Sequence, residues 1–300
     1  MRGIETPSND PIKGLDQLAT SLCKNKNTPL LVLYYHEFSG DVRLEDVEAI
    51  YGELRRGGFN REKPMENLHV LLHTFGGDPH AGYRIAQVIR DFTKSAVFLI
   101  PQYSCSAGTL MCLCGNQIEL GDYAFLSPID ITLERETPLE SVELMSIDYY
   151  IRFATRCRQE IEQMLKQNGY TSSTTVESDL LCEMVKQVGG LTLGAFFRER
   201  VLTGFYAENL LLDYMFNHAP NKNDLKNKIL QSLLFEYPSH TFCMDYHICL
   251  KLGLPVKEMD VVTSDMTKTI ITLLRLLTVQ GVICRDVSDA YKLPFVKLYT

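Results

Sequence analysis

The pattern of apolar and polar residues in the first half of the chain alternates between strand-like and helix-like segments. Continuous apolar runs at 29–36, 70–73 and 96–101 are typical of strands that are buried on both faces of a sheet. Between them, apolar residues recur at helical spacing over 43–56 and over about 80–92. Strands that alternate with helices predict an α/β fold with a parallel-rich sheet and right-handed crossovers.

After Leu133 the pattern becomes mostly helical. Thr137-Pro138-Leu139-Glu140 is a capping box with proline at the first helical position, which indicates the start of a long helix. We therefore divide the chain into a polar N-terminal arm at 1–28, an α/β core at 29–136 and a mostly helical extension at 137–300 that packs on the core. A second box starts a helix at 174, and further helices are expected at 192–217, 222–234, 241–252 and 265–280.

Composition narrows the class of protein. With 300 residues, of which 45% are hydrophobic and 22% charged, the chain is able to bury a substantial core. A net charge of -7 and the lack of a basic stripe argue against nucleic acid as a partner. No signal peptide or apolar stretch of membrane-spanning length occurs, so we expect a cytoplasmic protein without a membrane partner. Nine cysteines without framework spacing indicate reduced thiols, and no metal site or cofactor is predicted.

Two turns of small residues hold the candidate chemistry. The first contains Gly76-Gly77 and the second contains Ser106, and each joins a strand-like run to a helix-like segment. A serine at such a junction lies where free backbone N–H groups and the helix dipole favour negative charge, which suits a nucleophile whose reaction develops an oxyanion. The N–H groups of Gly77 and Ala107 are the predicted oxyanion donors. The alternative is that Ser106 only caps a helix and the glycines only form a turn.

The two blocks around these turns resemble the serine dehydrogenase proteinase family, a relative of the Clp protease proteolytic subunit and of the crotonase superfamily. HTFGGDPHAGYRIAQVI is similar to the family's strand-GG-helix pattern, and IPQYSCSAGTLMCLCGNQIELGDYAFLSPID to its SAGT turn and the GPID-like strand end that follows. SHTFCMDYHICLKLGLPV, from 239 to 256, looks like the family's histidine-containing segment. The resemblance covers 29–133, with a scattered continuation to 256. It implies a crotonase-like spiral of ββα turns and a homo-oligomer.

The general base is harder to assign, because the chain departs from the family's relatives at this point. Clp-type proteases place a histidine on the strand after the serine helix, but none occurs here between positions 80 and 218. Ser-Lys relatives need a later lysine, and none lies between 94 and 166. We predict His240 as the base, because it lies in the segment that resembles the histidine motif, with Asp130 as an orienting carboxylate. A structural histidine and a turn-forming aspartate are the alternatives, and the other histidines considered are His36, His73 and His80.

The predicted function is thus a serine hydrolase, and in particular a peptidase acting on a peptide or protein substrate. Ser106 attacks the carbonyl, His240 transfers the proton and Asp130 assists. Two alternatives stay open at this point. One is a catalytically inactive scaffold or interaction protein that keeps the fold, and the other is a crotonase-type enzyme in which the same N–H pair stabilises the enolate of an acyl-thioester.

Overall fold

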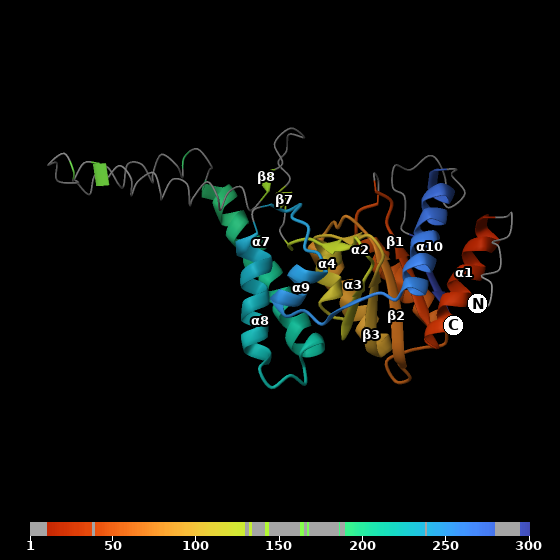
Figure 1. Ribbon diagram of the computed structural model, residues 1–300. Helices are drawn as coiled ribbons and strands as arrows, with labels where there is room; N and C mark the ends of the chain where they lie inside the picture. Colours follow the sequence, from red (N-terminus) through yellow and green to blue (C-terminus); the bar gives the residue numbers. More distant parts are fainter. Residues whose placement is uncertain are drawn as a thin grey trace.

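A central sheet organises the protein, as the computed structural model shows (Figure 1). The structure describes residues 11–37, 40–129, 190–237, 239–279 and 295–300, with short pieces at 132–133, 142–143, 163–164, 167 and 186. Within these residues the sheet has six strands in the order β10-β1-β2-β3-β5-β9, and all neighbours are parallel except β1 and β10. The strands are β1 Leu30–Tyr34, β2 Met65–His73, β3 Thr93–Ile100, β5 Gln117–Leu120, β9 Val256–Glu258 and β10 Phe295–Tyr299. The predicted α/β class with a mainly parallel sheet is confirmed.

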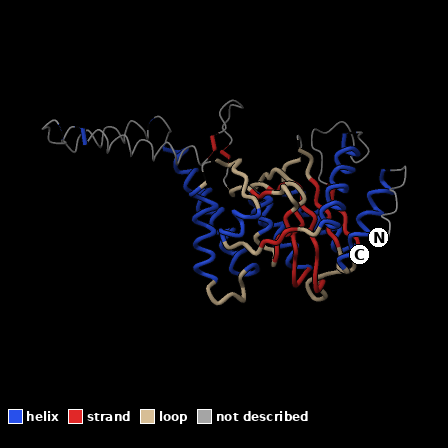
Figure 2. Tube along the Cα trace, in the orientation of Figure 1, coloured by secondary structure: helices blue, strands red, loops and turns tan. Residues whose placement is uncertain are grey.

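Helices cover both faces of this sheet (Figures 1 and 2). On one face, α2 (Leu44–Arg56), α3 (Pro79–Phe92) and α4 (Ala107–Cys112) pack on alternate strand residues such as Leu31, Val70 and Phe98. On the other, α1 (Pro11–Lys26) and α10 (Val261–Val279) pack on the intervening residues such as Val32, Leu71 and Leu99. Because both faces are buried, the strands read as continuous apolar runs.

A further group of helices lies against the α3 side of the molecule (Figure 1). It consists of α7 (Gly190–Leu210), which packs on α3, with α8 (Lys222–Gln231) and α9 (Tyr246–Leu252). Two π-helical turns, η1 (Leu211–Met215) and η2 (Ser232–Glu236), continue α7 and α8. The helices expected between 137 and 189 fall almost entirely outside the described residues.

Short strand pairings connect the loops that follow the sheet strands. β4 (Tyr103–Ser104) pairs in parallel with β6 (Phe125–Leu126), and Thr74 forms a parallel bridge with Ser104. Leu126 in turn forms an antiparallel bridge with Met244. Four segments that are far apart in the sequence therefore meet beside the ends of β2 and β3. A separate antiparallel pair joins β7 (Thr132–Leu133) and β8 (Val142–Glu143).

Both ends of the chain are more closely integrated into the core than the sequence analysis expected. The polar arm at 1–28 contains α1, whose apolar residues Leu15, Leu18, Ala19 and Leu22 are buried at helical spacing against the sheet. The C-terminal extension at 137–300 supplies two sheet strands, β9 and β10, as well as helices. β9 has only three residues, too few for a period to show, and β10 is placed in the sheet by its pairing with β1 at the other end of the chain.

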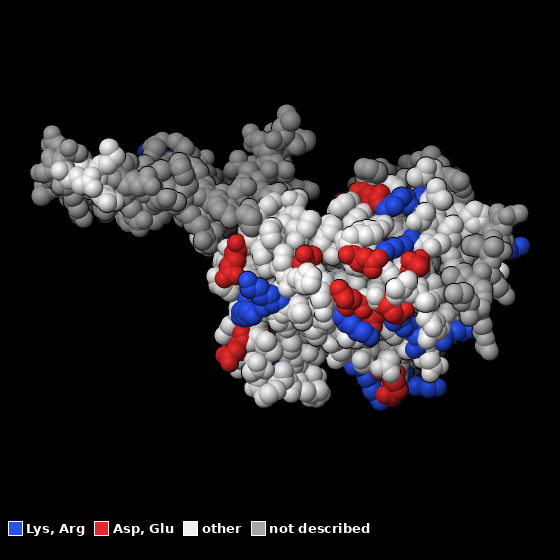
Figure 3. All heavy atoms as spheres, viewed as in Figure 1, with Lys and Arg blue, Asp and Glu red and all other residues white. Residues whose placement is uncertain are grey.

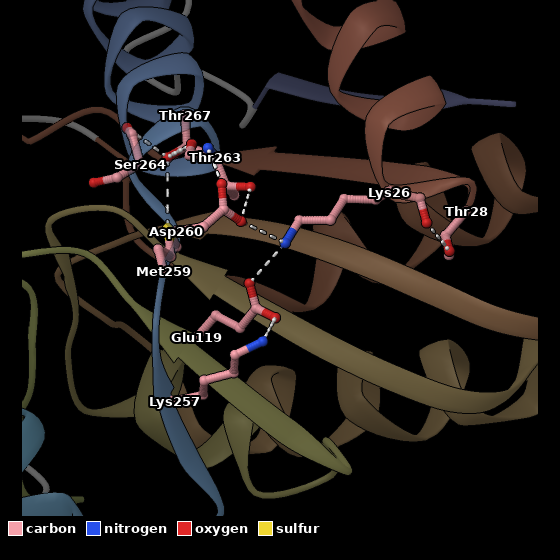
Figure 4. Close-up of polar contacts among 9 residues, drawn as sticks. All are labelled: Lys26, Thr28, Glu119, Lys257, Met259, Asp260, Thr263, Ser264 and Thr267. Carbon is pink, nitrogen blue, oxygen red and sulfur yellow. Dashed lines mark hydrogen bonds and ion pairs between the residues drawn. The ribbon is translucent and has the colours of Figure 1, made fainter.

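A partly buried ion network fixes the helices of the α1 and α10 face to the sheet (Figure 4). Lys26, at the end of α1, places its Nζ 3.1 Å from Glu119 Oε2 on β5 and 3.3 Å from Asp260 Oδ2 before α10. Asp260 also accepts hydrogen bonds from the N–H and the hydroxyl of Thr263, at 2.9 and 2.7 Å. Burial on its own raises the pKa of Asp260, but the Thr263 and Lys26 hydrogen bonds outweigh it and lower the pKa to about 2. Because Glu119 is buried, its charge needs this partner.

The surface has a mixed charge distribution. On the face shown in Figure 3, basic and acidic side chains lie interspersed over the sheet region. Within the described residues, no helix combines the length and the apolar character needed to cross a membrane.

Candidate functional site

Two turns meet at the carboxyl ends of neighbouring parallel strands. The first follows β2 and leads into α3, whose N-cap Asp78 accepts a hydrogen bond from the His80 N–H at 2.8 Å. The second follows β4 and leads from Ser106 into α4. Ligands of open α/β sheets commonly bind outside the carboxyl ends of the strands, so this edge is a natural place for a site.

The glycines of the first turn are required by close backbone contacts. Gly76 has a φ of 112°, and a Cβ at this position would lie 2.7 Å from the Ser106 Cβ and 2.9 Å from the Cys105 carbonyl oxygen. Gly77 has a φ of 142°, and a Cβ there would lie 2.4 Å from the Val42 nitrogen. Hydrogen bonds of 2.8 Å from Val42 N–H to the Gly76 oxygen and from Asp78 N–H to the Val42 oxygen fix the turn. Gly76 therefore allows the first turn to lie directly against the serine turn, and Gly77 allows it to lie against the Val42 backbone.

Ser106 has an unusual backbone conformation. Its φ is 50° and its ψ is −114°, and among the described non-glycine residues only Asn27 also has a positive φ. Such a conformation costs about 1–3 kcal/mol and persists only where the surroundings impose it. Although Ser106 occupies the N-cap position of α4, its side chain makes no capping hydrogen bond. The alternative that the serine only caps a helix is therefore not supported by the geometry.

The backbone N–H groups around Ser106 are not equivalent. The Ser106 N–H donates to the Ser127 hydroxyl at 2.9 Å. In the part of the chain that the structure describes, the N–H groups of Gly77 and Ala107 have no hydrogen-bond acceptor. The Ala107 nitrogen lies 3.4 Å from the position that a Gly76 Cβ would take, so the two turns that carry these N–H groups are in contact. The predicted oxyanion donors are thus on adjoining turns.

A chain of buried hydroxyl groups supports the serine turn from behind. The Thr109 hydroxyl donates to the Ser104 carbonyl oxygen at 2.8 Å and accepts from the Ser127 N–H at 3.2 Å. The Ser127 hydroxyl donates to the Pro128 carbonyl oxygen at 3.1 Å while it accepts from Ser106. Sequence reasoning did not select Thr109 or Ser127. Their only signal was their place in the SAGT and LSPID segments.

Cys105 precedes the serine but has a different environment. Its side chain is buried, and this burial raises the pKa of the thiol to about 12, although the Ser127 hydroxyl acts in the opposite direction. The thiol is therefore protonated at neutral pH and is a poor nucleophile. Cys105 therefore does not share the role proposed for Ser106.

The segment that contains His240 reaches the serine site through backbone pairing. Leu126 N–H donates to the Met244 oxygen at 3.0 Å, and Met244 N–H donates to the Leu126 oxygen at 2.8 Å. This bridge is one residue from Ser127, which holds the Ser106 N–H. His240 is half-buried and lies four residues before the bridge, so its segment and the serine turn are neighbours. Its role as base stays a prediction, and Asp130 lies outside the described residues.

Two other candidate histidines have partners elsewhere. His73 is completely buried at the end of β2, where burial lowers the pKa of its imidazole to about 4. Its ring stacks on Tyr34 of β1 and lies 4.2 Å, between ring centroids, from Tyr103 of β4, three residues before Ser106, and its Nε2 lies 3.6 Å from Glu37 Oε1. His80 places its Nδ1 2.9 Å from the Tyr206 hydroxyl of α7. His73 thus contacts the strand that leads into the serine turn, and His80 contacts α7.

The residues that the structure describes contain no group of three or more His, Cys, Asp or Glu side chains placed to hold a metal ion. The site, as far as it is described, consists of a strained serine, two glycines with positive φ, N–H groups without acceptors and neutral hydroxyl groups.

Comparison with known proteins gives one partial relative. An uncharacterized protein of Methanocaldococcus jannaschii is 29% identical over 89 residues, which cover 30% of this chain and 29% of that protein. The match therefore spans less than a third of the relative's length. No protein-family model matches the chain.

Proposed function

We propose that the protein is a serine hydrolase, and specifically a peptidase, with Ser106 as its nucleophile. The observation that carries the proposal is the conformation of Ser106: a serine with a φ of 50° and a ψ of −114° whose Cβ lies close against Gly76. Strained backbone of this kind is concentrated at functional sites because it must be stabilised by its surroundings. Neither a plain turn nor a helix cap requires it.

The chemistry follows from the groups on the two turns. The Ser106 oxygen attacks the substrate carbonyl and its proton passes to a base, for which we propose His240 with Asp130 in an orienting role. The negative charge that forms on the carbonyl oxygen is stabilised by the N–H groups of Gly77 and Ala107. Collapse of the tetrahedral intermediate breaks the amide bond, and the base returns the proton to the leaving amine. Water then attacks the acyl-enzyme and releases the acid, which restores the Ser106 hydroxyl.

The resemblance to the serine dehydrogenase proteinase family is consistent with this proposal. The mainly parallel sheet, the side pairing of β4 with β6 and the glycine turn beside the serine turn support a crotonase or Clp-like spiral of ββα units. We propose on the same basis a peptide or protein substrate, a homo-oligomer and a cytoplasmic location.

A fluorophosphonate probe tests the proposal, because it phosphonylates serine nucleophiles that are already activated. We expect the wild-type protein to be labelled and Ser106→Ala to remain unlabelled. Ser104→Ala serves as the matched control, since it removes a buried serine hydroxyl two residues earlier and leaves the nucleophile in place. Labelling of Ser106→Ala at the wild-type rate would show that another residue reacts, and the proposal would fail.

Two variants of the base region extend the same assay. His240→Ala is expected to lower the labelling rate by about 100-fold or more, because general-base catalysis contributes about that much. A rate equal to that of the wild type would remove His240 from the mechanism. If the wild-type protein resists the probe but binds coenzyme A thioesters, the acyl-thioester alternative replaces the hydrolase. If it does neither, a scaffold role replaces it.

A further inference from the structure

We propose that Ser127 is a positioning residue that holds the Ser106 turn in its reactive conformation. The Ser127 hydroxyl accepts the Ser106 N–H at 2.9 Å, and its side chain is almost completely buried. This inference rests on the proposed hydrolase function. It adds to it a residue whose side chain acts through the backbone of the nucleophile and does not touch the substrate.

The first argument concerns strain. With a φ of 50° and a ψ of −114°, Ser106 is in a region that an L-residue occupies only when its neighbours hold it there. On one side, the backbone of Gly76 lies against the Ser106 Cβ, so contact prevents the turn from collapsing toward β2. On the other side, Ser127 is the hydrogen-bond partner of the Ser106 N–H. The contact with Gly76 blocks movement of the serine turn toward β2, and the hydrogen bond to Ser127 opposes movement of the turn away from Ser127.

The second argument concerns the fixed position of Ser127 itself. Its N–H donates to the Thr109 hydroxyl at 3.2 Å, and its own hydroxyl donates to the Pro128 carbonyl oxygen at 3.1 Å. A hydroxyl oxygen that donates its proton, here to Pro128, still accepts through its lone pairs, so the same group also binds the Ser106 N–H. Because Thr109 lies in α4 and Ser127 lies just after β6, these bonds join the serine turn to a different strand. Ser127 is therefore fixed by its hydrogen bonds to Thr109 and Pro128, and from this fixed position it accepts the Ser106 N–H.

The third argument concerns which N–H groups stay available. Three consecutive N–H groups begin the serine turn, at Ser106, Ala107 and Gly108. Ser127 accepts the first, and the Cys105 carbonyl oxygen accepts the third at 2.7 Å. The Ala107 N–H between them has no acceptor within the described residues. By accepting the Ser106 N–H, Ser127 fixes the peptide plane between Cys105 and Ser106. The next plane, which carries the Ala107 N–H, is held by the hydrogen bond from the Leu110 N–H to the Ser106 carbonyl oxygen at 2.9 Å. Ser127 therefore fixes the backbone directly before the proposed oxyanion donor, and the direction of that donor depends on the Ser106 conformation that Ser127 helps to hold.

The test compares Ser127→Ala with Ser127→Thr, which keeps the hydroxyl. The probe-labelling reaction is resolved into its maximal rate and its half-saturating probe concentration. We expect Ser127→Ala to lower the maximal rate by about 10-fold, the effect of one hydrogen bond of ordinary strength, and to change the half-saturating concentration less than twofold. Ser127→Thr is expected to recover most of the rate. A general loss of structure would change both parameters and would not be rescued by threonine.

Two controls separate the possible outcomes. Ser104→Ala removes a fully buried hydroxyl that lies 3.8 Å from the Cys112 sulfur, and it keeps the backbone carbonyl oxygen that accepts from Thr109. It is therefore expected to leave the maximal rate unchanged. Amide hydrogen exchange at Ser106, read by NMR, is expected to be slow in the wild-type protein and in Ser104→Ala but at least 10-fold faster in Ser127→Ala.

The outcomes distinguish this inference from the proposed function. If the wild-type protein is labelled at Ser106 and Ser127→Ala reacts at the same maximal rate, the positioning role is overturned while the hydrolase stands. If the wild-type protein is not labelled at all, the hydrolase fails and the positioning role fails with it. Unchanged amide exchange at Ser106 in Ser127→Ala would also overturn the inference, whatever the labelling shows.

Discussion

Replacement of Gly76 by alanine is the sharpest perturbation that the site offers. The new Cβ would lie 2.7 Å from the Ser106 Cβ and 2.9 Å from the Cys105 oxygen, at a φ of 112°. The disfavoured backbone conformation costs about 1–3 kcal/mol and the overpacking a similar amount. Gly→Ala also stiffens the unfolded chain, which recovers about 0.4–1 kcal/mol where the native conformation permits. We therefore expect Gly76→Ala to lower the free energy of unfolding by about 2–5 kcal/mol.

The same substitution is expected to affect reactivity more strongly than stability. Relief of the clash separates the glycine turn from the serine turn, and a misplacement of about 1 Å at a reacting group is able to cost about 100-fold in rate. Urea denaturation followed by circular dichroism measures the first effect, and the rate of fluorophosphonate labelling measures the second.

Gly58→Ala is the matched control for Gly76→Ala. Gly58 also has a positive φ, at 82°, but a Cβ there meets no atom within 4 Å. It therefore tests backbone strain without a clash, and we expect a loss of only about 1–2 kcal/mol with no change in labelling. The reasoning is refuted if Gly76→Ala reacts at the wild-type rate and is no less stable than Gly58→Ala.

Three further predictions concern groups with perturbed pKa values. The buried Cys105 thiol, with its pKa raised to about 12, is expected to resist iodoacetamide at about pH 8, while exposed Cys243 is alkylated; mass spectrometry would contradict this if both react equally. The His73 imidazole, with its pKa lowered from 6.5 to about 4, is expected to stay neutral in NMR titrations until about pH 4. Because its folded-state pKa lies below the unfolded value, the contribution of His73 to stability is present above pH 6.5 and is lost as the pH falls toward 4. An NMR titration midpoint near pH 6.5 for the His73 imidazole would contradict this prediction. For Asp260, whose folded pKa of about 2 lies below its ordinary 3.8, the stability difference between wild type and Asp260→Asn is expected to be full above pH 4 and to shrink as the pH falls toward 2; a difference that stays constant in urea titrations at neutral and at low pH would contradict it.

The sequence predicts the centre of the fold well, because its elements are long and strongly patterned. The helices expected at 43–56 and 80–92 correspond to α2 and α3, and the strand run at 96–101 overlaps β3. The sheet could be expected to be buried on both faces because the runs are continuously apolar. In these segments the local pattern of apolar and polar residues is sufficient to predict the helix or strand.

The sequence predicts the ends of the sheet poorly, since long-range pairing determines them. β10 pairs antiparallel with β1 although more than two hundred residues separate them in the chain. β9 has only three residues, too few for a period to show. The sequence predicts a polar arm where α1 lies, because charged residues separate its apolar positions, and only the packing against α10 makes its buried side evident.

The residues of the candidate site also fall into two groups, those that the sequence identifies and those that depend on long-range contacts. The Gly-Gly pair and Ser106 could be selected from the sequence, because small residues between a strand and a helix have a physical meaning. The support from Ser127 could not, because nothing local in the sequence marks a serine that binds the N–H of a residue 21 positions earlier. The identity of the base also cannot be predicted from local sequence, because the position of His240 depends on the antiparallel bridge between β6 and Met244.

The most direct test of the account is to treat the intact wild-type protein with a fluorophosphonate and to locate the adduct by peptide mass mapping. The account predicts one phosphonyl group per chain on the peptide that contains Ser106, and no adduct in Ser106→Ala. An adduct on any other residue, or a wild-type protein that stays unmodified while its fold is intact, would contradict it.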